Sequence, residues 1–192
     1  MSESEETFYT ADRWQNWLDR VAEEDLDPEN EDSARLLLNL QDDTAIAIAK
    51  ILAAYDDDRL SEDEATDEIA DIRDIVLADV DIADEEKAML IDGVQTSLVC
   101  VFYSAEEYVV GGPADEGSIT EYVEAAAAAE AEEDVDAALG YLVQAGTRII
   151  DGEELPLDLV EDLEYGFVSE WVNGLDSLQS AMADPEVVEE DE

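Results

Sequence analysis

Residues 84–113 read DEEKAMLIDGVQTSLVCVFYSAEEYVVGGP. Asp84 is a residue type that commonly caps the start of a helix, and Gly111-Gly112-Pro113 is the strongest stop signal in the chain. Between these signals, from Met89 to Val110, apolar residues face more than one side of the expected helix. A helix that is apolar most of the way around is usually buried. We therefore expect residues 84–110 to form the central helix of the core, and the most buried helix of the protein.

The sequence before this stretch predicts three more helices. The first begins near Thr10 or Asp12, because apolar residues recur there at steps of three and four. The second covers residues 31–55 and ends at a run of three aspartates. The third begins after Ser61, because Ser61 followed by Glu64 is a capping box.

The sequence after this stretch also predicts helices only. Ser118 and Glu121 form a second capping box, and another helix ends at Asp151-Gly152. Pro156 then sits just inside the start of a long last helix, which Asp184-Pro185 closes. The buried face of that helix is expected to include Leu163, Phe167 and Trp171.

The fold class that follows is all-α: a bundle of about seven helices joined by short loops. Strand signals, such as alternating apolar residues bounded by Asn-Gly turns, are missing. We expect residues 1–192 to form a single all-helical domain with an internal hinge at 111–117 between two helical halves, and the alternative is that 111–117 separates two helical subdomains. The acidic ends, 1–7 and 186–192, are expected to fray.

Charge dominates the composition of this chain. It has 56 Asp and Glu against 8 Lys and Arg, a formal net charge of −48, yet 46% of its residues are hydrophobic. Such a charge opposes compaction at low salt, whereas the Debye length falls to about 3 Å at 1 M salt. The composition indicates a folded, halophilic, cytoplasmic protein, and it makes acidity uninformative about partners. Because the chain starts with acidic residues, we expect no signal peptide. Because it lacks a long apolar run, we expect no membrane partner.

Two absences exclude whole classes of site. The chain has no histidine, which excludes a Ser-His-Asp triad and every His-based zinc or haem site. It has one cysteine, which excludes an intrachain disulfide and a cysteine-rich metal cluster. Cys100 lies in an apolar stretch, and we expect it to be buried and structural.

Acidic motifs carry almost no information in this chain. Acids fill 56 of 192 positions, so acidic pairs at any one spacing, such as Glu68 and Asp71, are expected to recur many times along the chain by chance. A calcium loop ending at Glu64 would place Ala53 and Tyr55 at its first ligand positions, and neither side chain can bind calcium. We therefore predict no metal site, no cofactor and no catalytic residues.

Cations are rare, so each is more informative than an acid. Arg73 and Arg148 lie beside apolar faces and are candidate anchors for a carboxylate, a phosphate or an acidic partner. The eight cations form no basic stripe, so we expect no direct binding to nucleic acid.

Aromatic residues are dense near the N-terminus, at Phe8, Tyr9, Trp14 and Trp17. Tyr and Trp dominate the hot spots of protein interfaces, so these four residues are the candidate interaction surface. The alternative is that they close one end of the bundle as part of the core.

The stretch Phe8-Tyr9-Thr10-Ala11-Asp12-Arg13-Trp14-Gln15-Asn16-Trp17-Leu18 resembles an uncharacterised archaeal family, domain of unknown function family 2150. The length and the acidic, helical pattern agree over nearly the whole chain. The resemblance implies an archaeal, halophilic source, and it carries no activity or catalytic residue to transfer.

The biological function is therefore unknown from the sequence. The hypothesis we favour is a non-enzymatic interaction or adaptor protein that binds a protein partner or itself. One alternative is a magnesium-dependent hydrolase of a phosphorylated small molecule with clustered carboxylates. The other is an acidic DNA mimic that regulates a nucleic-acid-binding protein.

Overall fold

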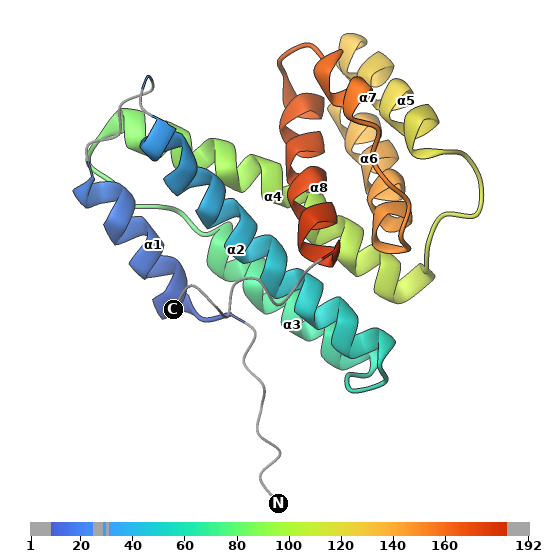
Figure 1. Ribbon diagram of the computed structural model, residues 1–192, viewed down its shortest axis with the longest axis horizontal. Coiled ribbons are helices and arrows are strands. Elements are labelled where there is room, and N and C mark those ends of the chain that lie inside the picture. Colours follow the sequence, from blue (N-terminus) through green and yellow to red (C-terminus); the bar gives the residue numbers. More distant parts are fainter. Residues whose placement is uncertain (1–8, 25–28, 30, 184–192) are drawn as a thin grey trace, which may run out of the picture.

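The computed structural model (Figure 1) describes residues 9–24, 29 and 31–183, and every regular element in those ranges is a helix. The prediction of an all-α bundle is confirmed, whereas the ends at 1–7 and 186–192 lie outside the described residues. The helices are α1 (Ala11–Glu23), α2 (Glu31–Asp56), α3 (Glu62–Val76), α4 (Glu85–Gly111), α5 (Ile119–Ala131), α6 (Val135–Ile150), α7 (Leu157–Glu161) and α8 (Phe167–Ala183).

Helix starts follow the local sequence closely. In α3, Ser61 Oγ accepts from the Glu64 amide and Glu64 Oε2 accepts from the Ser61 amide. Ser118 and Glu121 make the same reciprocal pair at α5. Asp84 caps α4 through the amides of Glu86 and Lys87. The two capping boxes and the helix start at Asp84 were predicted, because each cap depends on adjacent residues only.

Helix α4 is central, as predicted. It crosses the molecule behind α2 and α8 in Figure 1 and packs against α2, α3, α6 and α8. It is not the most buried helix, however, because α2 has 14 buried residues and α4 has 10. The ends of α4 extend past the core, so that Met89 is 74% exposed and Val110 is also exposed.

By length and composition, α4 is also the one helix in the described part of the chain that could cross a membrane. Half of its most apolar 18-residue stretch is buried inside the protein. The core helix of a soluble protein passes the same test. Four helices pack against α4, as they would against a core helix. The absence of a membrane partner stays a prediction.

Helices α4 and α8 cross with almost no space between their backbones. A Cβ atom on Gly174 would lie 2.0 Å from the carbonyl oxygen of Ser97. Ser97 Oγ also donates to Glu170 Oε2 at 3.2 Å, one turn earlier on α8. The crossing therefore depends on a glycine, and it fixes α8 against the middle of the central helix.

The prediction of one long last helix from Pro156 to Asp184 is wrong. The structure has a short α7, then residues 162–166 without helix, then α8. Phe167 was expected on the buried face and is 50% exposed. Glu130 of α5 occupies the break: its Oε2 accepts from the Val168 amide, a donor that a continuous helix would use for its own hydrogen bonds.

One hydrophobic cluster joins buried residues of α1 to α6 and α8, and side chains of α7 pack against it. A second, smaller cluster lies between α2 and α8 around Ala45, Ile46, Ala49 and Ala181. The single domain with its hinge at 111–117 stays a prediction.

Candidate interaction site

The break between α7 and α8 carries the most exposed aromatic side chain among the described residues. Tyr165 is 90% exposed, Leu157 is 68% exposed and Phe167 is 50% exposed. We call these three residues the α7–α8 surface. Single exposed apolar side chains are ordinary in soluble proteins, whereas contiguous exposed apolar patches mark interaction sites.

Glu130 at the end of α5 holds this break in place. Its Oε2 accepts a 2.6 Å hydrogen bond from the amide of Val168 in the first turn of α8. A carboxylate is favourable there, because the first amides of a helix have no partner within it and the helix dipole is positive at that end. Ser169 adds a local turn: its Oγ accepts from the Gly166 amide at 2.9 Å and donates to the Gly166 carbonyl at 2.8 Å.

The Phe167 side chain is held in place although half of it is exposed to solvent. Its ring stacks on Trp171, with centroids 5.6 Å apart and planes at 26°, and Trp171 is buried in the core. Offset aromatic stacking of this kind is favourable beyond the area it buries. Phe167 therefore loses little side-chain entropy on binding, because its ring is already packed on Trp171.

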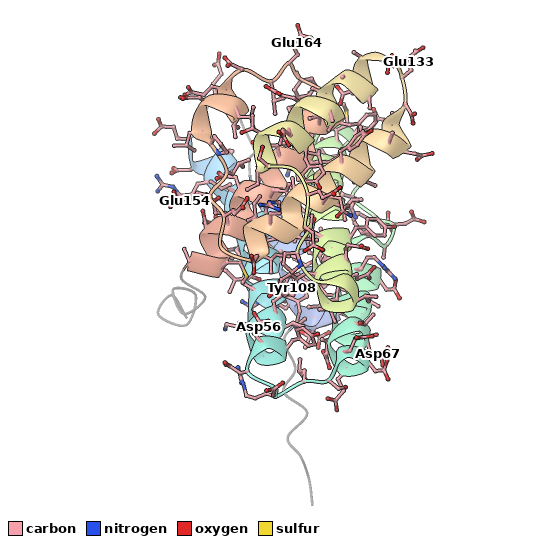
Figure 2. The ribbon with its side chains drawn as sticks, turned by 90° about the vertical axis from the view of Figure 1, so that its right-hand side faces the viewer. Asp56, Asp67, Tyr108, Glu133, Glu154 and Glu164 are labelled. Atoms are coloured by element: carbon pink, nitrogen blue, oxygen red, sulfur yellow. The ribbon has the colours of Figure 1, made fainter. Side chains whose placement is uncertain are left out.

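Acidic residues lie at the same end of the molecule as Tyr165. Asp162 and Glu164 are exposed beside Tyr165, and Glu164 and Glu133 both lie at the end of the molecule shown at the top of Figure 2. The turn between α5 and α6 brings Glu133 to the same end as α7 and the start of α8 (Figure 1).

The N-terminal aromatic residues pack differently from an exposed patch. Tyr9 and Trp14 are buried in the main cluster, and Trp17 is half-buried against it, while Phe8 lies outside the described residues. This placement matches the alternative in which the aromatics close the end of the bundle. Burial raises the pKa of Tyr9, whose ring also lies under the Arg13 guanidinium at 5.7 Å.

Asp43, which the sequence did not single out, joins α1 to α2. Its carboxylate is buried and accepts from Arg13 Nε at 2.8 Å, from Arg13 Nη2, and from Trp17 Nε1 at 2.9 Å. Lys87 supports the other end of α1 by donating to the carbonyl of Ala22 at 2.8 Å. No sequence signal distinguishes Asp43 from the many exposed aspartates, because its burial depends on how α1 folds back.

The two arginines singled out from the sequence both contact carboxylates. Arg148 makes a two-pronged pair with Glu153, at 2.9 and 2.5 Å, and also donates to the carbonyl of Ala114 at 2.6 Å. The hydrogen bond from Arg148 lowers the pKa of Glu153. Arg73 pairs with Glu106, where burial raises the pKa of the carboxyl and Arg73 opposes that rise. Their binding of a phosphate or of an acidic partner stays a prediction.

Two further features bear on metal and thiol chemistry: the acidic turn after α2, and Cys100. Among the residues that the structure describes, no group of three or more His, Cys, Asp or Glu side chains is arranged to hold a metal ion. In the acidic turn, Asp56 instead accepts a hydrogen bond from the Tyr108 hydroxyl at 3.2 Å. The pKa of Tyr108 is raised to about 12, mainly by burial and next by the negative charge of Asp56. Cys100 is buried, as predicted, and burial raises its pKa to about 12, which keeps the thiol protonated.

A family model described as an uncharacterized protein conserved in archaea (DUF2150) matches residues 7–191. The chain belongs to this family. The match confirms the resemblance drawn from the N-terminal stretch and indicates an archaeal protein. No curated protein and no solved structure matches the chain. The family carries no activity to transfer, so function must be argued from the site.

Proposed function

We propose that this archaeal protein is a non-enzymatic interaction protein, and that it binds a protein partner through the α7–α8 surface. The observation that supports this most is Tyr165, which is 90% exposed next to a half-exposed Phe167 stacked on a buried tryptophan. Tyrosine and tryptophan are enriched at binding hot spots. The N-terminal aromatics are a weaker candidate, because Tyr9 and Trp14 are already covered.

We further propose that the net charge of −48 adapts the protein to a cytoplasm with molar salt. Under that proposal the charge belongs to the whole surface and needs no specific partner. The magnesium-dependent hydrolase and the DNA mimic remain hypotheses that no specific observation favours.

Capture from a native archaeal lysate in molar KCl tests the proposed surface. The baits are the wild-type chain, Tyr165→Ser and Met89→Ser. Met89 is a matched control, because it is a large apolar side chain that is 74% exposed on a different helix. We expect the wild type and Met89→Ser to retain the same protein and Tyr165→Ser to lose it. If all three baits retain the same proteins, or if the wild type retains none, the proposed function is wrong.

A further inference from the structure

We propose that the loop between α4 and α5 is a latch that α6 holds closed, and that this latch opens as one unit while the surrounding helices stay folded. The loop covers residues 112–118, which we call the α4–α5 latch. This device does not rest on the proposed function, because the latch and the α7–α8 surface lie on different loops. It decides when the hinge expected at 111–117 can act.

Ala114 is held on both sides of its backbone by α6. Its amide donates to Thr147 Oγ1 at 3.1 Å, and its carbonyl accepts from Arg148 Nη1 at 2.6 Å. Thr147 and Arg148 are adjacent near the end of α6, and the whole of α5 separates them from the loop along the chain. The closed position of the latch therefore depends on α6, and α4 and α5 alone do not set it.

The two side chains that hold Ala114 are themselves held in place. Thr147 is buried, and its hydroxyl donates to the Gln144 carbonyl at 2.7 Å, so the same oxygen has a lone pair left for the Ala114 amide. Arg148 Nε and Nη2 donate to the two carboxylate oxygens of Glu153, at 2.9 and 2.5 Å. Because the guanidinium is planar, this fork fixes the direction of Nη1. Glu153 is thus a positioning residue, which acts on the latch through Arg148.

Little apolar burial opposes the opening of the latch. Every residue from 112 to 118 is exposed or half-buried, whereas α4, α5 and α6 all contribute buried residues to the main hydrophobic cluster. Segments with few buried apolar contacts open locally at a lower free energy than the whole protein. The hydrogen bonds to Ala114 are therefore expected to decide how often the latch opens.

Glycines in the left-handed region of backbone conformation lie near both ends of the latch. Gly112 has a φ of 76° and Gly117 has a φ of 80°. Glycine adopts positive and negative φ about equally well, so both positions can change conformation when the hydrogen bonds to Ala114 break. The Tyr122 hydroxyl of α5 donates to the Glu116 carbonyl, so this end of the latch stays with α5.

A closed latch restricts the hinge expected at 111–117. While both backbone groups of Ala114 are bound to α6, the loop cannot change conformation around them. At about 1 M salt the Debye length is about 3 Å, and only groups in direct contact still interact strongly. The Arg148–Glu153 pair is such a contact, so it keeps the latch closed in molar salt, and the hinge acts only when the latch opens.

Native-state hydrogen exchange of the full-length chain in molar KCl, read at single amides by NMR, tests the latch. Glu153→Gln keeps the size of the side chain and removes the charge that orients Arg148. We expect this variant to speed exchange at the Ala114 amide about fivefold, as the loss of one typical hydrogen bond implies. The Ala114 amide bonds to Thr147 and not to Arg148, so its response shows that both contacts open together. Glu154→Gln is the matched control, because Glu154 is exposed next to Glu153, and it should leave this exchange unchanged.

A second variant and a second amide complete the test. Thr147→Val removes the acceptor of the Ala114 amide and should speed its exchange at least about fivefold. The amide of Val101, which is buried in the middle of α4, reports on opening of the core. It should exchange slowly and at the same rate in the wild type and in every variant, because α4 stays folded when the latch opens.

The latch is wrong if exchange at Ala114 is the same in Glu153→Gln as in Glu154→Gln. It is equally wrong if Thr147→Val folds and leaves that exchange unchanged, or if the Ala114 amide is unprotected in the wild type. Acceleration at Val101 as large as that at Ala114 would also overturn it, because the loop would then open only with the whole protein. Glu153→Gln decides the matter even where Thr147→Val does not fold.

Discussion

Asp43 shows at the residue scale how one buried acid organises a helix contact. Its carboxylate accepts from two nitrogens of Arg13 and from the Trp17 indole, so each of its oxygens has a donor. Burying a carboxylate is costly unless it is paired and hydrogen-bonded. An asparagine at this position would keep one acceptor oxygen, but it would lose the charge and the second acceptor oxygen that serve Arg13 and Trp17.

We predict that Asp43→Asn lowers the free energy of unfolding by about 2–3 kcal/mol, since one partner of a buried pair is lost. Chemical denaturation in molar KCl measures this. Asp57→Asn is the control, because Asp57 is largely exposed and only 3.8 Å from Arg59, and such surface pairs contribute at most about 1 kcal/mol. Equal effects of the two substitutions would show that Asp43 does not hold α1.

Asp42, the neighbouring residue, gives a pH prediction. Burial raises its pKa above the ordinary value of 3.8, Ser177 opposes the rise, and Asp176 adds to it. A carboxyl with a raised pKa binds its proton more tightly in the folded chain. Its stabilisation is therefore complete below pH 3.8 and is lost as pH rises through the raised pKa.

Asp42→Asn should consequently be more stable than the wild type at pH 7, and this difference should shrink as pH falls toward 4. Thermal unfolding of both chains across this range, in constant molar KCl, isolates the effect from the titration of the other acids. A difference that stays constant with pH would contradict the raised pKa.

Helix packing at the element scale depends on two glycines with opposite surroundings. Gly174→Ala would drive a Cβ into the Ser97 carbonyl oxygen at the crossing of α4 and α8, whereas a Cβ on Gly140 would meet no atom within 4 Å. We predict a loss of about 1–3 kcal/mol for Gly174→Ala from overpacking. Gly140→Ala should gain up to about 1 kcal/mol from helix propensity. Denaturation curves that move in the same direction would contradict the close crossing.

The cap that Glu130 gives to α8 is a second test at this scale. Glu130→Ala should cost about 1 kcal/mol, the usual loss when a helix N-terminus loses its acceptor. Hydrogen exchange should also quicken at the Val168 amide, which donates to Glu130. Glu132→Ala is the matched control, since Glu132 is exposed on the same turn. Equal exchange at Val168 in both variants would show that the cap is not made.

The elements also show what the sequence can predict. Helix starts at Ser61, Asp84 and Ser118 were predicted because their caps depend on adjacent residues. The break before α8 was missed, because Glu130 lies far from Gly166 in sequence and only the fold brings them together. The signal that could have indicated it is Gly166 itself, a poor helix residue within an otherwise continuous apolar pattern.

The candidate site was missed for the same reason. Phe167 fits the spacing of a buried face, and only the interrupted helix turns half of it toward solvent. Tyr9 and Trp14 have the residue types of a binding hot spot, yet the structure buries them. Residue type alone does not separate core aromatics from exposed ones, because burial depends on contacts between distant elements.

For the whole molecule, we propose that the negative charge is an adaptation to salt and that recognition resides in a few exposed aromatic side chains. With 56 acids and 8 cations, the chain repels itself at low salt, and only screening removes most of that repulsion. The apolar core is ordinary, so stability should be limited by charge when salt is low.

Circular dichroism between about 0.1 M and 3 M KCl tests this claim most directly, because the Debye length falls from about 10 Å to below 3 Å over that range. We predict that helicity and melting temperature rise steeply with KCl. Unchanged helicity and melting temperature across the range would contradict the claim, and the acidity would then require a functional cause such as DNA mimicry.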